Sequence, residues 1–230
     1  MSNADDADRQ QMHRGQQRYR MPAGARQILL IRHGAATGET VETYEYGDLT
    51  ITNPPLTEEG QQQAVALAAH LAGEAIAAIF VTPLQRTHQT AAPLAAARGL
   101  VPVALPDLRE VHLGDWEHSF HRHARAGHPL LMRMFAEESW NVLPNAEPME
   151  EFAARVRRGV LDIVEAMAPN TTVVSFSHAG TIAELCRQAT GSRPFAFVAP
   201  ENTSISRLIV GPDGRWKLRS FNDVAHLGYL

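Results

Sequence analysis

The segment QILLIRHG, residues 27–34, decides how the rest of the chain is arranged. Its four consecutive large apolar residues predict a short strand that is buried on both faces of a sheet. The strand leads directly into Arg32 and His33, and ligands of an open α/β sheet collect at the carboxyl ends of the strands. Gly34 lets the backbone turn sharply and approach a ligand closely. The tripeptide alone is equally consistent with a strand that ends in a solvated Arg-His pair, so other segments have to decide.

Composition narrows the class of protein. A chain of 230 residues with 44% hydrophobic and 20% charged residues is typical of one soluble globular domain, with or without an insertion. The formal charge of −4 argues against a nucleic-acid partner, which favours a basic surface. The single cysteine, Cys186, excludes an internal disulfide, suits a reducing compartment and is expected to be a core residue. We therefore expect a cytoplasmic protein.

Two boundaries follow from the pattern of apolar residues. Residues 1–26 are polar and contain no apolar segment of a signal peptide, so we expect a mostly disordered tail there and a domain over residues 27–230. No run approaches 18 apolar residues, which predicts no membrane span. Residues 118–148 interrupt the domain with a segment rich in His, Arg and Met, which we expect to be an insertion.

Strands and helices alternate along the domain. Apolar runs predict strands at 28–31, 76–81, 101–103, 171–176, 203–210 and 216–221, and helical periodicity predicts helices at 61–71, 84–98, 149–167 and 181–190. Thr82 is the expected cap of the second helix, with Pro83 in its first turn. Residues 35–55 are polar and rich in Gly and Thr, which predicts a long functional loop. The alternation predicts a three-layer α/β/α sandwich around a mainly parallel sheet.

Two of these strands deliver a histidine at their carboxyl ends, namely His33 and His178. A third strand leads into the helix that carries Arg86, and parallel strands place all three ends on one edge of the sheet. Two histidines and two arginines then meet near helix N-termini, which themselves favour anions. This combination indicates a phosphate site. A metal site ranks lower, because its ligands would not be crowded by arginines.

Six segments follow one another along the chain: RHG (32–34), PLTEEGQQQA (55–64), TPLQRTHQTA (82–91), LREVHLGDWE (108–117), SHAGTI (177–182) and NTSIS (202–206). Taken in this order, they resemble the histidine phosphatase superfamily, which has the phosphoglycerate mutase-like fold. The resemblance covers residues 27–210. It implies a small phosphorylated substrate, no cofactor and no metal ion, and it leaves a homodimer open.

The resemblance also implies a role for each site residue. His33 would attack phosphorus and form a phosphohistidine. Arg32, Arg86 and His178 would hold the phosphoryl oxygens, with main-chain N–H groups near Ala179 and Gly180 as further donors. Glu110 would protonate the leaving oxygen and then activate water, with Glu117 as the fallback acid. We therefore expect a metal-independent phosphomonoester hydrolase.

The chain also departs from the family pattern. Ala36 and Glu39 occupy positions where many members carry a hydroxyl residue and an asparagine, and a carboxylate at Glu39 would repel phosphate. We therefore expect the loop over residues 35–53 to be re-routed. Two alternatives stay open: a phosphoglycerate mutase-like phosphotransferase, and a catalytically weak protein that binds phosphorylated ligands. The chain has fewer basic residues than the glycolytic mutases use to hold their bisphosphate cofactor, and this favours hydrolysis over phosphate transfer.

The insertion is expected to set specificity. It mixes cations with apolar residues, which predicts a helical lid over a small metabolite that has an apolar portion. Histidines 112, 118, 121, 123 and 128 are numerous enough for a metal site, but no accompanying carboxylate or cysteine pattern supports one. We expect these histidines to lie in a solvated or lid segment.

Overall fold

The centre of the molecule is a six-stranded sheet with the strand order β5-β4-β6-β1-β7-β8. The computed structural model describes residues 19–38 and 42–228. The strands are β1 (Arg26–Arg32), β4 (Ile76–Val81), β5 (Val103–Ala104), β6 (Thr172–Ser177), β7 (Ile205–Val210) and β8 (Trp216–Asp223). Only β7 runs against the others, because it pairs antiparallel with both β1 and β8 while the remaining pairs are parallel. The sheet is therefore mainly parallel, as the sequence predicts.

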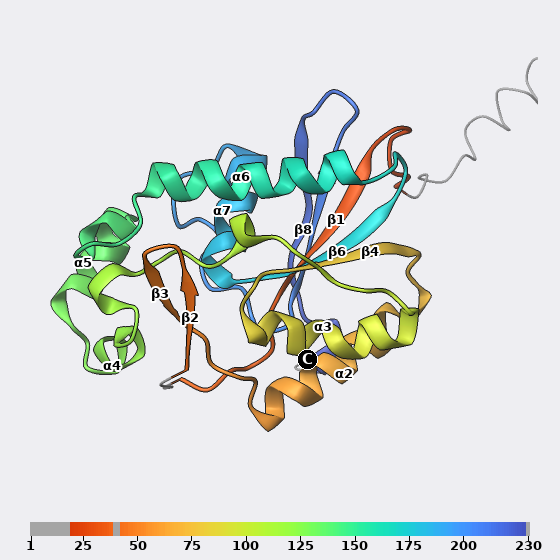
Figure 1. Ribbon diagram of the computed structural model, residues 1–230. Coiled ribbons are helices and arrows are strands. Elements are labelled where there is room, and N and C mark those ends of the chain that lie inside the picture. Colours follow the sequence, from red (N-terminus) through yellow and green to blue (C-terminus); the bar gives the residue numbers. More distant parts are fainter. Residues whose placement is uncertain (1–18, 39–41, 229–230) are drawn as a thin grey trace, which may run out of the picture.

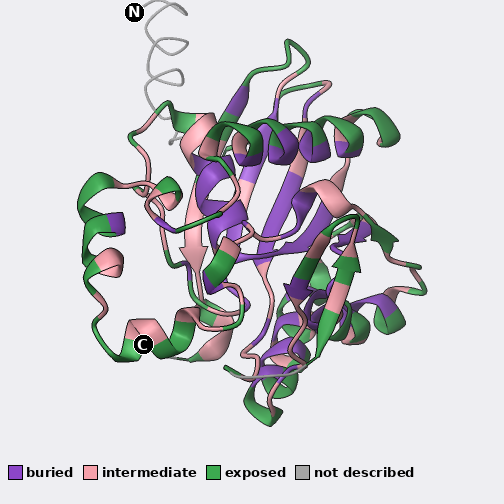
Figure 2. Cartoon of the chain, turned by 60° about the vertical axis from the view of Figure 1, so that its left-hand side comes forward, coloured by how far each residue is buried: buried purple, intermediate pink, exposed green. Residues whose placement is uncertain are grey.

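Strand β1 lies in the middle of the sheet and is buried on both faces. Ile28 and Leu30 contribute to one apolar cluster, and Leu29 and Ile31 contribute to a second cluster on the opposite face. All four side chains are fully buried. The purple strands between two helical layers in Figure 2 show the same burial for the whole centre of the sheet. An unbroken apolar run is what a strand covered on both faces requires.

Four long helices form the two outer layers. Helices α2 (Glu58–His70) and α3 (Gln85–Arg98) cover one face, and α6 (Met149–Ala166) and α7 (Ala179–Thr190) cover the other, as Figure 1 shows. The Thr57 hydroxyl caps α2 by accepting from the Gly60 N–H at 3.1 Å, and Glu58 and Glu59 occupy its first turn. Cys186 on α7 is fully buried, and burial raises its pKa to about 12. The predicted three-layer sandwich is confirmed.

The segment after Gly34 departs from the predicted long loop. It contains a β-hairpin, β2 (Thr43–Tyr46) and β3 (Leu49–Thr52), which forms a separate two-stranded sheet. Isolated pairing also joins Ala36 to Leu56. That the loop over residues 35–53 is re-routed relative to the family pattern stays a prediction, and Glu39 lies outside the described residues. Because β2 and β3 alternate polar and apolar residues over only four positions each, the sequence pattern was too short to reveal them.

The insertion is helical. It comprises α4 (Phe120–Arg125), α5 (Pro129–Glu137) and the short 3-10 turn η4 (Trp140–Val142). Its own apolar cluster is built on the buried side chains of Trp116, Met134 and Leu143. The hairpin and the insertion both lie on the side toward which β1 and β6 run (Figure 1). That the insertion closes over a ligand stays a prediction.

Smaller corrections concern the ends of elements. Strand β5 begins at Val103 and not at Val101, and short 3-10 turns occur at Leu71–Gly73, Pro106–Leu108, Gly114–Trp116 and Ala225–Leu227. Ala25 is fully buried and Arg26 opens β1, so the packed domain reaches into the segment expected to be a tail; residues 1–18 lie outside the described part. Within the described residues, no helix combines the length and the apolar character needed to cross a membrane.

Candidate active site

The register of β1 against β6 places the two strand-end histidines side by side. Ile31 pairs with Phe176 and Arg32 pairs with Ser177, so the two strands end at the same level. The His33 N–H then donates to the Ser177 carbonyl at 3.0 Å. The imidazole rings of His33 and His178 consequently lie with their centroids 5.3 Å apart. The predicted convergence of the strand ends is present in the structure.

His33 has one ring nitrogen that is free to act as a nucleophile. Its Nδ1 lies 2.8 Å from the carbonyl oxygen of Gly34. A carbonyl can only accept, so Nδ1 carries the proton and Nε2 keeps its lone pair. Burial, followed by the charges of Arg86 and Arg32, holds the pKa of His33 well below its ordinary value. The neutral imidazole is therefore the form present at neutral pH.

Arg32 and Arg86 supply positive charge beside this imidazole. The Arg32 Nη1 donates to the carbonyl of Pro200 at 2.7 Å, and its buried Nε has no partner among the described residues. Arg86 is only 7% exposed and donates from Nη1 to the Thr52 carbonyl at 3.1 Å. Burial lowers the pKa of Arg86 to about 10, against the opposing effect of the Glu110 and Glu117 carboxylates. Both guanidinium groups are thus charged at neutral pH and desolvated, which strengthens their attraction for an anion.

The third expected ligand of the phosphoryl group, His178, is fully buried at the N-cap position of α7. Its Nε2 lies 2.9 Å from the hydroxyl oxygen of Thr82. The prediction that Thr82 caps the next helix is wrong, because α3 begins at Gln85 and Leu84 occupies its cap position. The threonine is engaged with the histidine instead, a contact that local helix signals could not reveal.

Glu110 lies against the N-terminus of α7. Its Oε2 accepts from the Gly180 N–H at 3.0 Å, and its Oε1 accepts from the N–H groups of Thr181 at 3.1 Å and Val111 at 3.0 Å. The Gly180 N–H, expected as a phosphate donor, is thus engaged by Glu110, and this part of the prediction is corrected. Ala179 is the first residue of α7 and follows His178 directly. A helix N-terminus favours a carboxylate at this position.

A buried ion pair fixes the backbone that carries Glu110. Arg155 of α6 donates to both carboxylate oxygens of Glu147, at 2.5 and 2.6 Å. The same guanidinium donates to the carbonyls of Asp107, Arg109 and Glu110 at 2.8–2.9 Å. Arg155 is 4% exposed. Arg155 therefore ties α6 to the loop over residues 107–117 that carries Glu110, here called the acid loop.

Glu117, the fallback acid, holds the hairpin. Its Oε1 accepts from the Thr52 N–H at 3.1 Å and from the Thr52 hydroxyl at 2.9 Å, and its Oε2 accepts from the Leu113 N–H at 3.0 Å. At the other end of the hairpin, the Arg109 guanidinium lies 4.8 Å from the centre of the Tyr46 ring. Arg109 therefore faces Tyr46 and Glu147, at 3.6 Å, and does not pair with Glu110. Glu117 therefore anchors the hairpin, and Glu110 stays the acid that the family resemblance implies.

The loop before β7 binds the backbone at the end of β1. The Asn202 amide donates to the His33 carbonyl at 2.8 Å, and the Thr203 N–H donates to the Arg32 carbonyl at 3.0 Å. These contacts hold the backbone of the strand end from the side opposite to β6. Asn202 belongs to the segment NTSIS, whose spacing alone does not show this contact.

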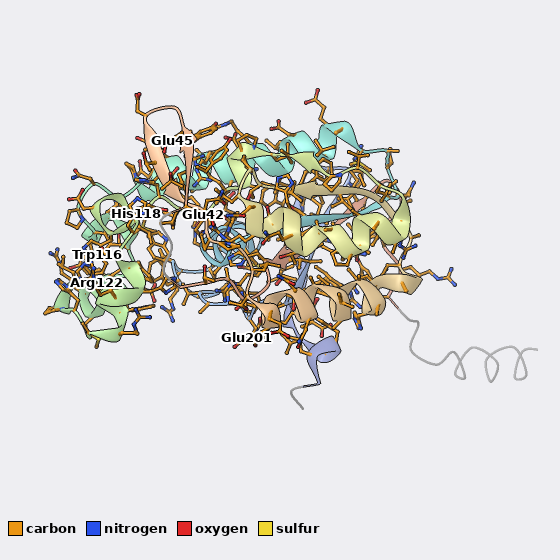
Figure 3. The ribbon with its side chains drawn as sticks, turned by 60° about the horizontal axis from the view of Figure 1, so that its bottom comes forward. Glu42, Glu45, Trp116, His118, Arg122 and Glu201 are labelled. Carbon is orange, nitrogen blue, oxygen red and sulfur yellow. The ribbon has the colours of Figure 1, made fainter. Side chains whose placement is uncertain are left out.

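Three of the histidines in or near the insertion, His112, His123 and His128, are engaged in ring packing or in hydrogen bonds to the backbone. His123 stacks on Trp116 with ring centroids 4.3 Å apart, and His128 meets the same indole edge-on at 5.0 Å. The Nδ1 atoms of His112 and His128 accept from nearby backbone N–H groups, both at 3.2 Å. Figure 3 shows Trp116, just before the insertion, near His118 at its start, and Glu45 on the hairpin. Over residues 19–38 and 42–228, no group of three His, Cys, Asp or Glu side chains is placed to hold a metal ion.

Comparison with known families decides the assignment. The model of the histidine phosphatase superfamily, branch 1, matches residues 28–224. The chain belongs to this enzyme superfamily. The match includes both strand-end histidines, both arginines and Glu110, so the family extends over the whole site described above.

Several relatives come from mycobacteria. A glucosyl-3-phosphoglycerate phosphatase of Mycobacterium tuberculosis is 33% identical over 168 residues, which are 70% of this chain and 74% of that protein. The native structure of the mycobacterial glucosyl-3-phosphoglycerate phosphatase superposes with a TM-score of 0.68 at 30% identity and covers 86% of this chain and 99% of that one. The same phosphatase in complex with VO3 gives a TM-score of 0.70 at 29% identity, with the same coverage.

A longer relative shows that this domain occurs within larger proteins. A bifunctional protein of Mycobacterium tuberculosis is 32% identical over 203 residues, which are 87% of this chain and 54% of that protein. The chain thus spans about half the length of the first curated relatives that it matches. The shared part is the histidine phosphatase domain.

Proposed function

We propose that the chain is a metal-independent phosphomonoester hydrolase that acts through a phosphohistidine on a small phosphorylated metabolite. The observation that carries the proposal is the state of His33. Its Nδ1 proton is held by the Gly34 carbonyl, and its pKa is lowered by burial and by Arg86 and Arg32, so Nε2 keeps a lone pair beside two guanidinium groups. A neutral nucleophile next to fixed positive charge suits attack on an anionic phosphorus centre.

The first step transfers the phosphoryl group to the enzyme. The lone pair of Nε2 on His33 forms a bond to phosphorus while the bond from phosphorus to the leaving oxygen breaks. Arg32, Arg86 and His178 hold the three non-bridging oxygens, over which charge spreads in the transition state. Glu110 gives a proton to the leaving oxygen, and its Oε2, which accepts one N–H, has more room for that proton than Oε1, which accepts two.

The second step returns the enzyme to its starting state. Glu110, now a carboxylate, takes a proton from water as the water oxygen attacks the phosphorus of the phosphohistidine. The bond between phosphorus and Nε2 breaks, inorganic phosphate leaves, and Glu110 is again protonated. The positive charge for both steps comes from side chains of the chain itself, and a divalent cation beside Arg32 and Arg86 would be repelled.

Two comparisons support hydrolysis. The mycobacterial relative is named a phosphatase of glucosyl-3-phosphoglycerate, and its structure has been solved with VO3, an anion that resembles phosphate. We propose that the non-phosphate part of the substrate contacts the hairpin and the insertion, whose helix α5 exposes Met132 and Phe135. Insertion variants that keep the wild-type ranking of substrates would count against this second point.

Release of phosphate from para-nitrophenyl phosphate, with EDTA present and a His33→Ala variant alongside, tests the proposal. We expect turnover that the chelator leaves unchanged and the substitution abolishes. Activity that survives His33→Ala would mean that another residue is the nucleophile. Isomerised phosphate ester in place of inorganic phosphate would indicate a mutase, and tight binding of phosphate esters without turnover would indicate a binding protein.

A further inference from the structure

The hydrogen bonds of His178 are unequal at its two ring nitrogens. Nε2 lies 2.9 Å from the Thr82 hydroxyl, whereas Nδ1 is buried and has no partner among the described residues. The ring is fully buried and its centroid is 5.3 Å from that of His33. A buried nitrogen without a partner is costly unless a ligand satisfies it. Nδ1 is therefore the ring nitrogen of His178 that is available to bind a ligand.

His178 carries a single ring proton at neutral pH. Burial is the largest cause that holds its pKa well below the ordinary value, and the charge of Arg86 acts in the same direction. The proton must therefore reside on Nδ1 or on Nε2, and the partner of Nε2 decides between them. Only the tautomer with the proton on Nδ1 can donate from that nitrogen to a phosphoryl oxygen. The other tautomer would direct a lone pair at an anion.

The surroundings of Thr82 favour donation by its hydroxyl to the histidine. The Thr87 hydroxyl has two carbonyl acceptors, Leu84 at 2.8 Å and Thr82 at 3.0 Å, so its own proton is committed to the backbone. The Thr82 hydroxyl proton then has two acceptors, the Thr87 oxygen at 3.1 Å and the His178 Nε2 at 2.9 Å. The Thr87 oxygen also accepts the Thr82 N–H at 3.2 Å. The imidazole nitrogen is the nearer acceptor and the one with no other donor in the structure described.

We propose that Thr82 is a positioning residue whose hydroxyl donates to Nε2 of His178 and so keeps the proton on Nδ1, as the donor to a phosphoryl group bound beside His33. The proposal rests on the proposed function, because it assumes that the ligand of His178 is a phosphoryl group. It also explains why a threonine occupies position 82. A role as helix cap does not explain the residue, because its oxygen reaches only the Leu84 N–H, at 3.4 Å.

The tautomer of His178 can be measured directly by nitrogen-15 NMR of the imidazole side chains, without any substrate. We expect the proton on Nδ1 in the wild type and in Thr82→Ser, which retains the hydroxyl. We expect Thr82→Val to shift the proton to Nε2 or to mix the tautomers. A wild-type His178 with its proton on Nε2 would overturn the proposal, whatever the stability of the variants.

Calorimetric titration with inorganic phosphate gives a second readout. Thr82→Val should bind phosphate about 10-fold more weakly than the wild type, the loss expected for one hydrogen bond to a charged group, and Thr82→Ser should bind within about twofold. Thr87→Val is the matched control. It removes a hydroxyl from the same cluster, but the Thr87 hydroxyl makes no hydrogen bond to His178. This variant should leave phosphate affinity unchanged. Equal losses in Thr82→Val and Thr87→Val would contradict a role through His178. A chain that shows the predicted tautomer and affinities but no turnover would support Thr82 while refuting hydrolysis.

Discussion

Glu117 and Thr52 are joined by two hydrogen bonds, one from the Thr52 N–H at 3.1 Å and one from its hydroxyl at 2.9 Å. The carbonyl of the same threonine accepts from Arg86 at 3.1 Å. A carboxylate in the acid loop therefore fixes, through one residue of the hairpin, the guanidinium that lies beside His33. The hairpin is thus part of the anion site as well as a neighbour of the insertion.

Glu117→Ala should weaken phosphate binding by about 10-fold, or about 1.4 kcal/mol, because Thr52 and with it Arg86 lose their anchor. Glu117→Gln should lie between this variant and the wild type, since the amide oxygen can still accept from Thr52. Calorimetric titration with phosphate measures both. If Glu117→Ala lowers only the free energy of unfolding and leaves phosphate affinity intact, the link from Glu117 to Arg86 does not contribute to phosphate binding.

Two glycines of the site should respond differently to alanine. A Cβ at Gly180 would lie 2.7 Å from Oε1 of Glu110, the mobile end of a side chain. Gly180→Ala should therefore displace the acid and reduce kcat by about 10²-fold, a loss typical for a general acid, with little change in stability. Steady-state kinetics combined with urea denaturation separates the two effects. Unchanged kcat would show that Glu110 can move without cost to the reaction.

At Gly60, an added Cβ would meet backbone atoms, which cannot move aside as the Glu110 side chain can. A Cβ there would lie 2.0 Å from the carbonyl oxygen of Ala35, next to Gly34. Gly60→Ala should lower the free energy of unfolding by about 3 kcal/mol, the upper part of the range for overpacked sites. Gly73→Ala is the control, because nothing lies within 4 Å of its added Cβ, and it should have a small effect. Equal stabilities in urea would mean that the contact between the His33 loop and α2 is loose.

The ion pair of Arg155 and Glu147 should matter for both stability and activity. Arg155→Met removes the nearer of the two cationic partners of the buried Glu147 carboxylate and leaves only Arg109 at 3.6 Å, so we expect a cost of about 3 kcal/mol, the low end of the range for a broken buried pair. The Glu110 carbonyl also loses its donor, so kcat should fall. Adding Glu147→Leu should recover stability without recovering kcat. Full recovery of both by the second substitution would show that Arg155 does not hold the acid loop.

The lowered pKa values of His33 and His178 predict a loss of stability in acid. In the unfolded chain each histidine takes up a proton as the pH falls through about 6.5, whereas in the folded chain both stay neutral to a lower pH. Protons therefore favour the unfolded chain below pH 6.5, by up to about 1.4 kcal/mol per pH unit for each histidine. The free energy of unfolding of His33→Asn, measured in urea from pH 7 to pH 5, should fall less steeply than that of the wild type. Parallel slopes would contradict the burial of a neutral His33.

The sequence predicts the central strands of the sheet, because strands that are buried on both faces consist of unbroken apolar runs. The apolar runs of β1 and β6 end in histidines, and the parallel pairing that brings these histidines together follows from the alternation of strands and helices. The same reasoning brings Arg86 to the site. The burial of Arg86 could not be predicted, because its acceptor is the Thr52 carbonyl. Thr52 belongs to a hairpin whose strands are short and mix polar with apolar residues.

Contacts between segments distant in sequence account for the remaining differences. The contact of Thr82 with His178 spans 96 residues, and local rules assigned the threonine to a helix cap. Arg155 lies 45 residues from the Glu110 carbonyl that it holds, and an arginine on a helix is ordinarily solvated. The family resemblance pointed to Glu110, but its engagement with the N–H groups of α7 could be seen only in the fold.

The most direct test of the central claim is to trap the phosphoenzyme. Wild-type protein is mixed with a phosphorus-32-labelled phosphomonoester, quenched in alkali within one turnover and digested, and the labelled peptide is sequenced. The account predicts one label, stable in alkali and labile in acid, on the peptide that contains His33, and no label in His33→Ala. Label on another residue, or rapid turnover with no labelled enzyme, would contradict a phosphohistidine mechanism at His33.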